Sequence, residues 1–239
     1  MNGFAIQDLS MVILAGGLGT RLRSVLPDLP KPMALVNGRP FLEILVAQAA
    51  RAGFRDVVLC VGYRADAIEA HFGDGRGHGV RMRYAHEREL LGTAGAVLNA
   101  QAMVGSDPFV VINGDSYCAV DFSRMMAHHR DHRAAATIVA VQVTDSSRYG
   151  SLQLEPDGAI AGYNEKAQAL SAGWINAGIY LLQRSVLQPL AQGRPASLER
   201  DLFPVLVGQR ALYAFKTSGM FIDIGIPSEL ERAQTLLRD

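Results

Sequence analysis

Four short apolar runs, separated by helical patterns, fill the first half of the chain and restrict its fold more than any other feature. The runs are MVILA at 11–15, VVLCV at 57–61, VRMRYA at 80–85 and FVVIN at 109–113. The intervening stretches near 40–52, 65–72 and 93–103 have the spacing and end signals of helices. Apolar strands separated by helices predict a parallel sheet that is covered on both faces and has right-handed crossovers. We therefore expect a Rossmann-like first half.

From about residue 134 the pattern changes to longer β runs joined by short turns. They are TIVAVQV at 137–143, SLQLE at 151–155, AIAGYN at 159–164, WINAGIYLL at 174–182 and ALYAF at 211–215. Such a meander predicts a mixed or antiparallel portion that walls one side of a cleft. A helical stretch at 197–207 and a last helix from Pro227 follow. With 239 residues and no evident repeat or linker, we expect a single domain over 1–239 with lobes at about 11–133 and 134–239.

Charge and cysteine content exclude several functional classes. Lys+Arg and Asp+Glu both total 23, so the chain has no overall attraction to nucleic acid or to an anionic membrane. No apolar run approaches the ~18 residues of a membrane helix, and the leader lacks the features of a signal peptide, which predicts a cytoplasmic protein. Cys60 and Cys118 lie in or beside apolar runs without metal-site spacing, so we expect two buried free thiols.

Flexible backbone and positive charge meet in LAGGLGTRLRSVLPDLPKPM, at residues 14–33. Glycines allow backbone N–H groups to approach phosphate oxygens, and a loop after the first strand lies at the ligand-binding edge of an α/β sheet. A dinucleotide fingerprint fits poorly, because Leu22 stands at its third glycine position and no acidic residue ends the second strand. The P-loop pattern is absent. By itself the loop could also be a structural glycine turn.

The loop together with PKPM closely resembles the signature of the sugar-phosphate nucleotidylyltransferase family. Further matching segments follow in the family's order: ERELLGTAGA at 87–96, NGD at 113–115, RYG at 148–150, NEK at 164–166, NAG at 176–178 and FIDIGIP at 221–227. The resemblance implies a Rossmann-like three-layer αβα nucleotidyltransferase fold, with a mostly parallel mixed sheet and a small sugar-binding β portion. It also implies an enzyme that joins a sugar 1-phosphate to a nucleoside triphosphate and releases pyrophosphate.

At closer range, LRSVLPDLPKPM, NEKA and FIDIGIPSELERAQ look most like members that transfer GMP from GTP to D-glycero-D-manno-heptose 1-phosphate. This implies GTP and a sugar 1-phosphate as partners, and a GDP-heptose product for bacterial surface polysaccharide. Mannose 1-phosphate as acceptor, or uridylyl transfer within the same family, are alternatives. A non-catalytic nucleotide-sensing homologue is a further one, although the residues that such a protein would lose are present. A monomer or small homo-oligomer is expected.

The resemblance supplies catalytic roles that agree with the chemistry. An acceptor phosphate is already an anion, so attack on the α-phosphorus requires charge neutralisation and positioning, with no general base. Arg21 and Lys31 are expected against the triphosphate and the α-phosphate. Asp115 and Asp223 are expected to bind Mg²⁺, which accepts one or two carboxylates beside phosphate oxygens and water. Asp115 could instead cap a turn or helix.

Binding residues also follow from the resemblance. Nucleotide binding is assigned to Leu14, Ala15, Gly16, Gly17, Gly19, Thr20, Glu87, Gly92 and Thr93, and sugar-phosphate binding to Gly150, Glu165, Lys166 and Asn176. Glu165 and Lys166 could instead form an ion pair with each other on the surface. Ala167 stands where many relatives have proline.

Glu87 stands where thymidylyl relatives carry Gln. A carboxylate accepts from both N1–H and N2–H₂ of guanine, whereas an amide suits uracil or thymine, so the residue favours GTP. Glu89 or the backbone could read the base instead.

His128 and His132 are spaced i, i+4, which also fits a metal site. Because charged residues interleave with these histidines and with His129, we expect a solvated helix face.

Overall fold

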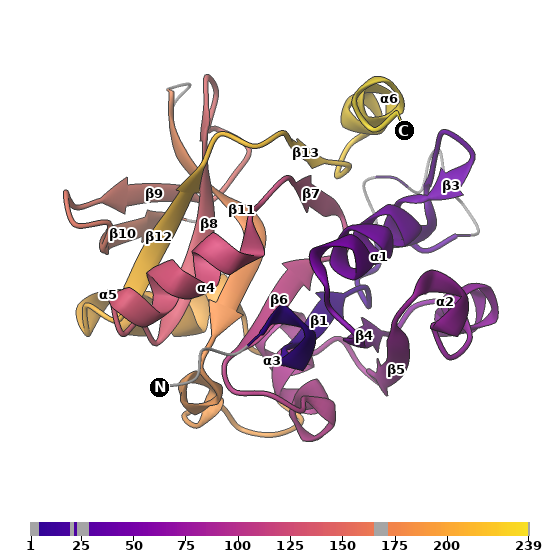
Figure 1. Ribbon diagram of the computed structural model, residues 1–239, viewed down its shortest axis with the longest axis horizontal. Helices are drawn as coiled ribbons and strands as arrows, with labels where there is room; N and C mark the ends of the chain where they lie inside the picture. The colour runs from indigo at the N-terminus through magenta and orange to yellow at the C-terminus, as the bar shows by residue number, and fades with distance from the viewer. Residues whose placement is uncertain (1–4, 20–21, 23–28, 165–171, 239) are drawn as a thin grey trace.

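The computed structural model describes residues 5–19, 22, 29–164 and 172–238. A nine-stranded central sheet runs through it, and helices cover both faces (Figure 1). Its parallel part has the order β6-β1-β4-β5. The bounds are β1 Ser10–Leu14, β4 Asp56–Val61, β5 Arg81–His86 and β6 Phe109–Asn113. All four strands lie within one or two residues of the predicted runs, so the α/β prediction for this half is confirmed.

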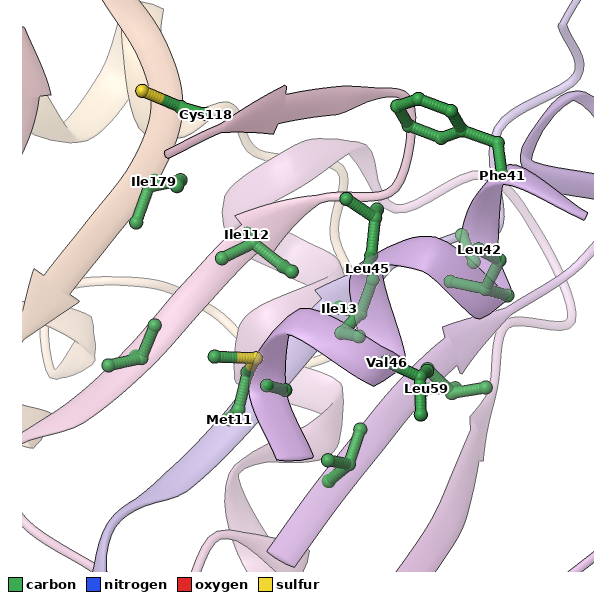
Figure 2. Close-up of a cluster of buried hydrophobic side chains, with 14 of the residues drawn as sticks. Met11, Ile13, Phe41, Leu42, Leu45, Val46, Leu59, Ile112, Cys118 and Ile179 are labelled. Atoms are coloured by element: carbon green, nitrogen blue, oxygen red, sulfur yellow. The ribbon is translucent and has the colours of Figure 1, made fainter. Parts of the chain in front are cut away.

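The helices of the first half follow the expected alternation with strands. They are α1 Phe41–Ala52, α2 Ala65–Phe72, α3 Gly92–Ala100 and α4 Phe122–Asp131. The α1 helix ends at Gly53, whose φ of 103° lies in the left-handed region that glycine adopts without strain. Figure 2 shows Leu42, Leu45 and Val46 of α1 packed against the apolar side chains of the sheet.

Alternation along β1 divides the core into two layers. Met11 and Ile13 belong to the cluster under α1, whereas Val12 belongs to the cluster on the other face, which includes residues of α3. Since Met11, Val12 and Ile13 are thus buried in one layer or the other, the middle of this strand requires apolar residues.

The second half adds antiparallel strands to the same sheet. They are β8 Ala136–Val143, β9 Ser151–Leu154, β10 Ile160–Asn164 and β11 Gly173–Leu182, and β12 Leu212–Thr217 adds a parallel pairing with β8. Strand β11 pairs with β8 along one edge, while its other edge pairs first with β9 and then with β6. The register shifts between Asn176 and Tyr180, where Gly178 has a φ of 74°. This bulge allows one strand to join the parallel half to the meander.

Short elements complete the chain. The extended ones are a hairpin of β2 Leu35–Val36 with β3 Arg39–Pro40, and an antiparallel pair of β7 Ser116–Cys118 with β13 Phe221–Asp223. The helical ones are η1 Ile6–Asp8, η3 Lys31–Met33, η4 Arg76–His78, η5 Gln101–Met103, η6 Arg184–Leu187, η7 Leu198–Leu202, α5 Phe203–Gly208 and α6 Pro227–Leu236. The expected helix at 197–207 is therefore divided into the π-helical turn η7 and α5, because Pro204 near the start of α5 has no N–H to continue the ladder.

The interpretation of the histidines of α4 as a solvated face is wrong. His129 is only 5% exposed, and its Nδ1 lies 2.8 Å from the Thr137 hydroxyl of β8. His128 is half-buried against Phe215, and the His132 ring lies beside Tyr213. Burial lowers the pKa of His129 to about 4, so it packs as a neutral ring. The charged neighbours misled the prediction, because one face of α4 covers strands β8 and β12 while the arginines point outward.

Two expectations about the rest of the chain can also be compared with the structure. Cys60 and Cys118 are both buried free thiols, as predicted. Among the described residues, no helix has the length and apolar character needed to cross a membrane.

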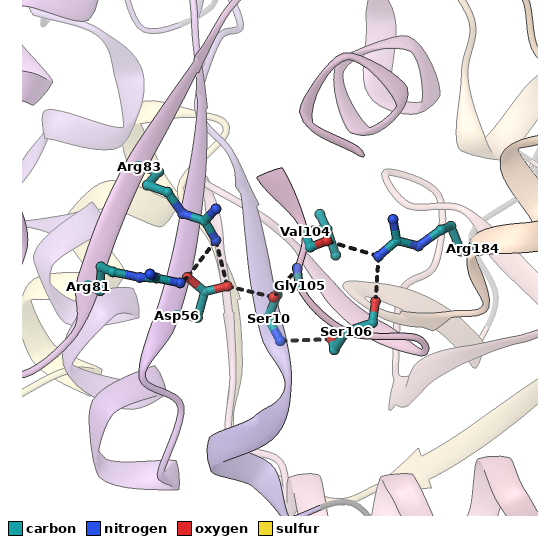
Figure 3. Close-up of polar contacts among 8 residues, drawn as sticks. All are labelled: Ser10, Asp56, Arg81, Arg83, Val104, Gly105, Ser106 and Arg184. Carbon is teal, nitrogen blue, oxygen red and sulfur yellow. Dashed lines mark hydrogen bonds and ion pairs between the residues drawn. The ribbon is translucent and has the colours of Figure 1, made fainter. Parts of the chain in front are cut away.

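A network of hydrogen bonds and ion pairs links the amino-terminal ends of β1 and β4, at the end of the sheet opposite the glycine-rich loop (Figure 3). The Asp56 carboxylate accepts hydrogen bonds from the Ser10 hydroxyl at 2.6 Å and from Arg83 at 2.6 and 2.7 Å, and Arg81 adds a third partner at 3.0 Å. The Ser10 N–H in turn donates to Ser106. Burial by itself raises the pKa of Asp56, but the hydrogen bonds from Ser10, Arg83 and Arg81 outweigh it and hold this pKa below its usual value.

We expect Asp56→Asn to lower the free energy of unfolding by about 1–2 kcal/mol near neutral pH, because it removes the charge from a carboxylate whose side chain is 16% exposed, while the exposure of Arg81 limits the effect. The folded pKa is lowered, so this stabilisation is present above the unfolded pKa of about 3.9 and is lost as pH falls through the folded value. Thermal unfolding at a series of pH values measures it. Asp66→Asn, in an exposed pair with Arg64, is the control and should change stability by less than about 0.5 kcal/mol. Equal effects of the two variants would contradict the argument.

Candidate active site

A cleft of about 510 Å³ lies beyond the carboxyl ends of β1 and β6, where α/β sheets bind ligands. It brings together ten of the residues singled out from the sequence: Leu14, Ala15, Gly16, Gly17, Gly19, Lys31, Glu87, Gly92, Thr93 and Asp115. Asp223 contacts this group from β13. Thr20, Arg21, Glu165 and Lys166 lie outside the described residues.

The glycine-rich loop allows charged side chains to approach the backbone closely. A β-carbon on Gly16 would overlap the Glu87 carboxylate, and one on Gly19 would lie 2.8 Å from Cβ of Lys31. Gly19 also has a φ of 57°. Position 19 therefore requires glycine, whereas a side chain at Gly16 would displace the Glu87 carboxylate, which supports a loop built around its charged neighbours.

Lys31 lies between two carboxylates that come from distant parts of the chain. Its Nζ is 2.5 Å from Oδ2 of Asp115 and 3.9 Å from Oδ1 of Asp223. The short turn η3 fixes the lysine, with Pro30 before it and Pro32 after it. Its side chain is only 13% exposed. A lysine held in this way presents one fixed positive charge to the cleft.

The two aspartates meet because β13 pairs with β7. Asp115 follows β6, and Asp223 is opposite Ser116 in the β7–β13 pair. The Ile224 N–H donates to the Asp115 carbonyl at 2.9 Å, and the Gly225 N–H donates to the Asp223 carboxylate at 2.6 Å. These backbone bonds place both carboxylates at the same end of the cleft.

The electrostatics of this pair fit a divalent cation. Burial and the facing Asp115 carboxylate raise the pKa of Asp223 to about 6, although Lys31 opposes the shift. Two half-buried carboxylates that repel each other are stabilised by a bound cation, and Mg²⁺ requires only one or two of them when phosphates and water complete its shell. Among the described residues, no three His, Cys, Asp or Glu side chains cluster as a metal site.

Glu87 follows strand β5 and points into the cleft. Its Oε2 accepts the Leu91 N–H at 3.1 Å, and its own N–H donates to the Val61 carbonyl. Burial raises the pKa of the carboxyl, and the hydrogen bond from Leu91 partly opposes this effect. Glu89 is exposed and does not line the cleft, so Glu87 is the better placed of the two carboxylates for reading a base.

The amino terminus of α3 is already capped by the protein. The Ala94 and Gly95 N–H groups donate to the Ala196 carbonyl at 2.9 and 3.1 Å, and the Ala196 N–H donates to the Leu91 carbonyl. A β-carbon on Gly92 would lie 2.6 Å from the Ala196 carbonyl oxygen. The Ala94 and Gly95 N–H groups are therefore unavailable to a phosphate.

Two of the four residues assigned to the sugar phosphate lie side by side. The Asn176 N–H donates to the Gly150 carbonyl at 2.8 Å, and a β-carbon on Gly150 would overlap the Tyr163 hydroxyl. The Asn176 side chain belongs to the bulge of β11, where its Oδ1 accepts the Gly178 N–H at 2.9 Å. Gly178 in turn lies against Asn113, which lines the cleft.

Sequence reasoning missed several residues of the site. Asn113 lines the cleft, and its Oδ1 is buried without a partner among the described residues. Its place at the end of a predicted strand beside Asp115 could have indicated it. Leu18 and Leu90 also line the cleft and are 39% and 50% exposed, which gives its mouth apolar surface. Nothing in the sequence distinguishes these leucines from core residues.

Comparisons with known proteins agree on one family. The family model described as nucleotidyl transferase matches residues 10–239. The D-glycero-alpha-D-manno-heptose 1-phosphate guanylyltransferase of Aneurinibacillus thermoaerophilus is 35% identical over 230 residues, which cover 96% of this chain and 99% of that protein. The mannose-1-phosphate guanylyltransferase of Mycobacterium tuberculosis is 34% identical over 230 residues, but the chain spans only 64% of its length.

A solved structure gives the same result for the fold. The crystal structure of HddC from Yersinia pseudotuberculosis complexed with GMP-PN has a TM-score of 0.84 and 35% identity, and the alignment covers 96% of this chain and all of that one. The predicted fold class, a mixed sheet between helical layers, is therefore confirmed.

Proposed function

Because this chain belongs to the nucleotidyl transferase family, we propose that it transfers GMP from GTP to a sugar 1-phosphate, with a heptose 1-phosphate as the preferred acceptor. An oxygen of the acceptor phosphate attacks the α-phosphorus of GTP, the bond to the β-phosphate oxygen breaks, and pyrophosphate leaves. The observation that carries the proposal is the convergence of Lys31, Asp115 and Asp223 at one end of a glycine-lined cleft.

The charges of the cleft suit this reaction. The attacking and leaving groups are both anions, so the barrier falls mainly through positioning and neutralisation of charge. We assign Lys31 to the negative charge on the α-phosphate and Arg21 to the triphosphate. Members of the family generally use a divalent metal ion, and we assign Asp115 and Asp223 to Mg²⁺, which would neutralise phosphate charge there. No side chain is required to remove a proton from the acceptor.

The lobe at about 134–239 supplies the acceptor side in this proposal. Gly150 and Asn176 offer a backbone group and a side-chain oxygen to sugar hydroxyls, while Glu165 and Lys166 contact a hydroxyl and the acceptor phosphate.

Mannose 1-phosphate is the second candidate acceptor, because the M. tuberculosis relative is a guanylyltransferase for that sugar. The heptose candidate is favoured by coverage, since the alignment spans almost the whole of the A. thermoaerophilus protein. Pyrophosphate release, measured with four nucleoside triphosphates against a panel of sugar 1-phosphates, tests both. No release above background with any pair would contradict the proposed activity.

We expect Glu87→Gln to lower kcat/KM for GTP about tenfold to a hundredfold, because an unmade buried hydrogen bond costs roughly 1–3 kcal/mol. The Gln oxygen is needed by the Leu91 N–H, so the new NH₂ group takes the place of Oε1 beside Gly16 and faces a donor edge of guanine. Use of UTP should hold or rise, because its edge has both a donor and an acceptor. The ratio of kcat/KM for GTP and UTP, at one saturating sugar 1-phosphate, is the measurement.

Glu89→Gln is the matched control for the base prediction. The same substitution two residues away removes an exposed carboxylate outside the cleft, and the GTP to UTP ratio should stay within about twofold of the wild-type value. A changed ratio in Glu89→Gln with an unchanged ratio in Glu87→Gln would move base recognition to Glu89.

A further inference from the structure

A chain of partly buried hydrogen bonds joins Thr93, which lines the cleft, to Asn176 through Tyr180 and Glu199. On the acceptor side, Nδ2 of Asn176 donates to the Tyr180 hydroxyl at 2.9 Å, and this hydroxyl lies 3.3 Å from Oε1 of Glu199. On the nucleotide side, the Thr93 hydroxyl donates to Oε2 of Glu199 at 2.7 Å. Tyr180 is completely buried in β11, and Glu199 lies in η7. The path therefore runs between residues 93 and 176, which the proposed function places on different substrates.

The direction of each proton in this chain is fixed by its neighbours. The Thr93 oxygen accepts the Leu198 N–H at 2.8 Å, so its own proton goes to Glu199. Burial and the nearby carboxylate raise the pKa of Tyr180 well above its usual value, so its hydroxyl keeps a proton to donate. Since all these hydroxyls donate toward Glu199, the position requires a group that only accepts.

Ser197 adds a third donor and anchors the turn. Its hydroxyl accepts the N–H groups of Glu199 and Arg200 at 3.2 Å each, and donates to Oε2 of Glu199 at 2.8 Å. The preceding Ala196 carbonyl caps α3. The segment at 196–199 is thus bonded to the first turn of α3 through both its backbone and the Glu199 carboxylate.

The Asn176 amide is oriented by the same chain. Its oxygen accepts the Gly178 N–H, and its NH₂ group donates to the hydroxyls of Tyr163, at 3.1 Å, and Tyr180. Both amide hydrogens are used within the protein, so Asn176 can offer a ligand only a lone pair of its oxygen. A sugar hydroxyl that binds Asn176 must therefore donate a hydrogen bond to the amide oxygen. The orientation of this amide depends on Tyr180 and, through Tyr180, on Glu199.

We propose that Glu199 is a positioning residue that couples the nucleotide side of the cleft, through Thr93, to the sugar side, through Tyr180 and Asn176. The inference rests on the proposed function, because Thr93 and Asn176 are assigned to the two substrates there. When the carboxylate is lost, both hydroxyls lose the acceptor that sets their direction, and the two sides become misaligned together.

The test is Glu199→Gln, which keeps the size of the side chain but places an NH₂ group among three hydroxyl donors. We expect KM for GTP and KM for the sugar 1-phosphate each to rise about tenfold, as for the loss of a buried hydrogen bond. Tyr180→Phe should raise KM for the sugar 1-phosphate alone, and it should add little in the Glu199→Gln background, because the path is already broken.

Asp201→Asn provides the matched control. Asp201 lies in the same turn and accepts the Ser197 N–H at 2.7 Å, but it does not belong to the chain between the substrates. Its substitution should lower the unfolding temperature about as much as Glu199→Gln does, while both KM values stay within about twofold. A Glu199→Gln variant whose KM values match those of Asp201→Asn would reduce Glu199 to a structural role.

A second measurement needs no turnover. The side-chain amide resonances of Asn176, recorded by NMR on substrate-free protein, should shift in Glu199→Gln and in Tyr180→Phe but not in Asp201→Asn. Unshifted resonances in Glu199→Gln would overturn the proposal whatever the enzyme does. If the two variants show these shifts but the wild-type protein turns over no substrate pair, the proposed function is contradicted instead.

Discussion

Lys31→Met should reduce kcat by about two orders of magnitude or more while the fold remains intact, the size of effect typical for removing a preorganised charge at a reacting group. Lys31 lines the cleft and contacts both Asp115 and Asp223 there. Pro30 and Pro32, on either side of it, restrict its backbone. Methionine keeps much of the length and apolar stem of the side chain, so the change removes mainly the charge. Initial rates of pyrophosphate release at saturating GTP and sugar 1-phosphate measure the effect.

Lys216→Met is the control for that experiment. Lys216 is an exposed lysine on β12 that lies over the Trp174 ring and does not line the cleft, and its substitution should leave kcat within about twofold. A folded Lys31→Met protein with nearly wild-type kcat would remove Lys31 from the catalytic assignment. Equal losses in both variants would indicate a general effect of lost positive charge.

Asp115→Asn and Asp223→Asn should each lower kcat at ordinary magnesium concentrations by about a hundredfold or more, because each removes one of the two carboxylates assigned to the cation. More magnesium should restore part of the activity, since the remaining carboxylate and the phosphates still offer ligands. Rates measured over a magnesium titration separate a weakened metal site from a lost charge in the protein. Full activity at low magnesium in either variant would eliminate that aspartate as a ligand.

Without a bound metal ion, we expect loss of the Asp223 charge to stabilise the protein. The pKa of Asp223 is raised to about 6 by burial and by Asp115, above its unfolded value of about 3.9. A raised carboxyl pKa means that ionisation costs folded-state stability, a cost that is absent below the unfolded pKa and complete above the folded one. In a chelator, Asp223→Asn should therefore raise the unfolding temperature at pH 8 and change it little at pH 4. A lower unfolding temperature at pH 8 would show that the carboxylate is stabilised without a cation.

Asp121→Asn controls for a carboxylate near the same strand end. Asp121 caps α4 by accepting the Arg124 N–H at 3.0 Å and does not line the cleft. Asparagine is an equally good cap, so neither the magnesium dependence nor the stability should change appreciably.

The parallel half of the fold follows from the sequence because its strands are buried on both faces. A run such as VVLCV leaves no polar face for solvent, so a covered sheet is its natural place. The pairing of β11 is different. Periodicity identifies WINAGIYLL as a strand, but the bulge at Gly178, which lets it change neighbours from β9 to β6, depends on tertiary pairing that a single sequence does not show.

The site residues also fall into those that motifs in the sequence indicate and those that only the folded structure brings together. The glycine-rich loop, Lys31 and the two aspartates could be recognised as a group because their motifs are specific and lie at strand ends. The direct contact of Lys31 with Asp115 could not be predicted, because the two residues are 84 positions apart and no local signal links them. Glu199 was missed because its hydroxyl partners at Thr93 and Tyr180 are 106 and 19 residues away, a separation without a local signal.

The position of β11 beside β6 also has a consequence for folding during synthesis. As the chain emerges from the ribosome, β1, β4, β5 and β6 can pair with one another, but one edge of β6 stays open until Ile179 to Leu182 arrive, more than sixty residues later. An unpaired apolar strand edge is a place where nascent chains associate wrongly. Non-local pairing of this kind also slows folding. Strand β11, which joins the two halves of the sheet, thus also closes an apolar edge that would otherwise stay open.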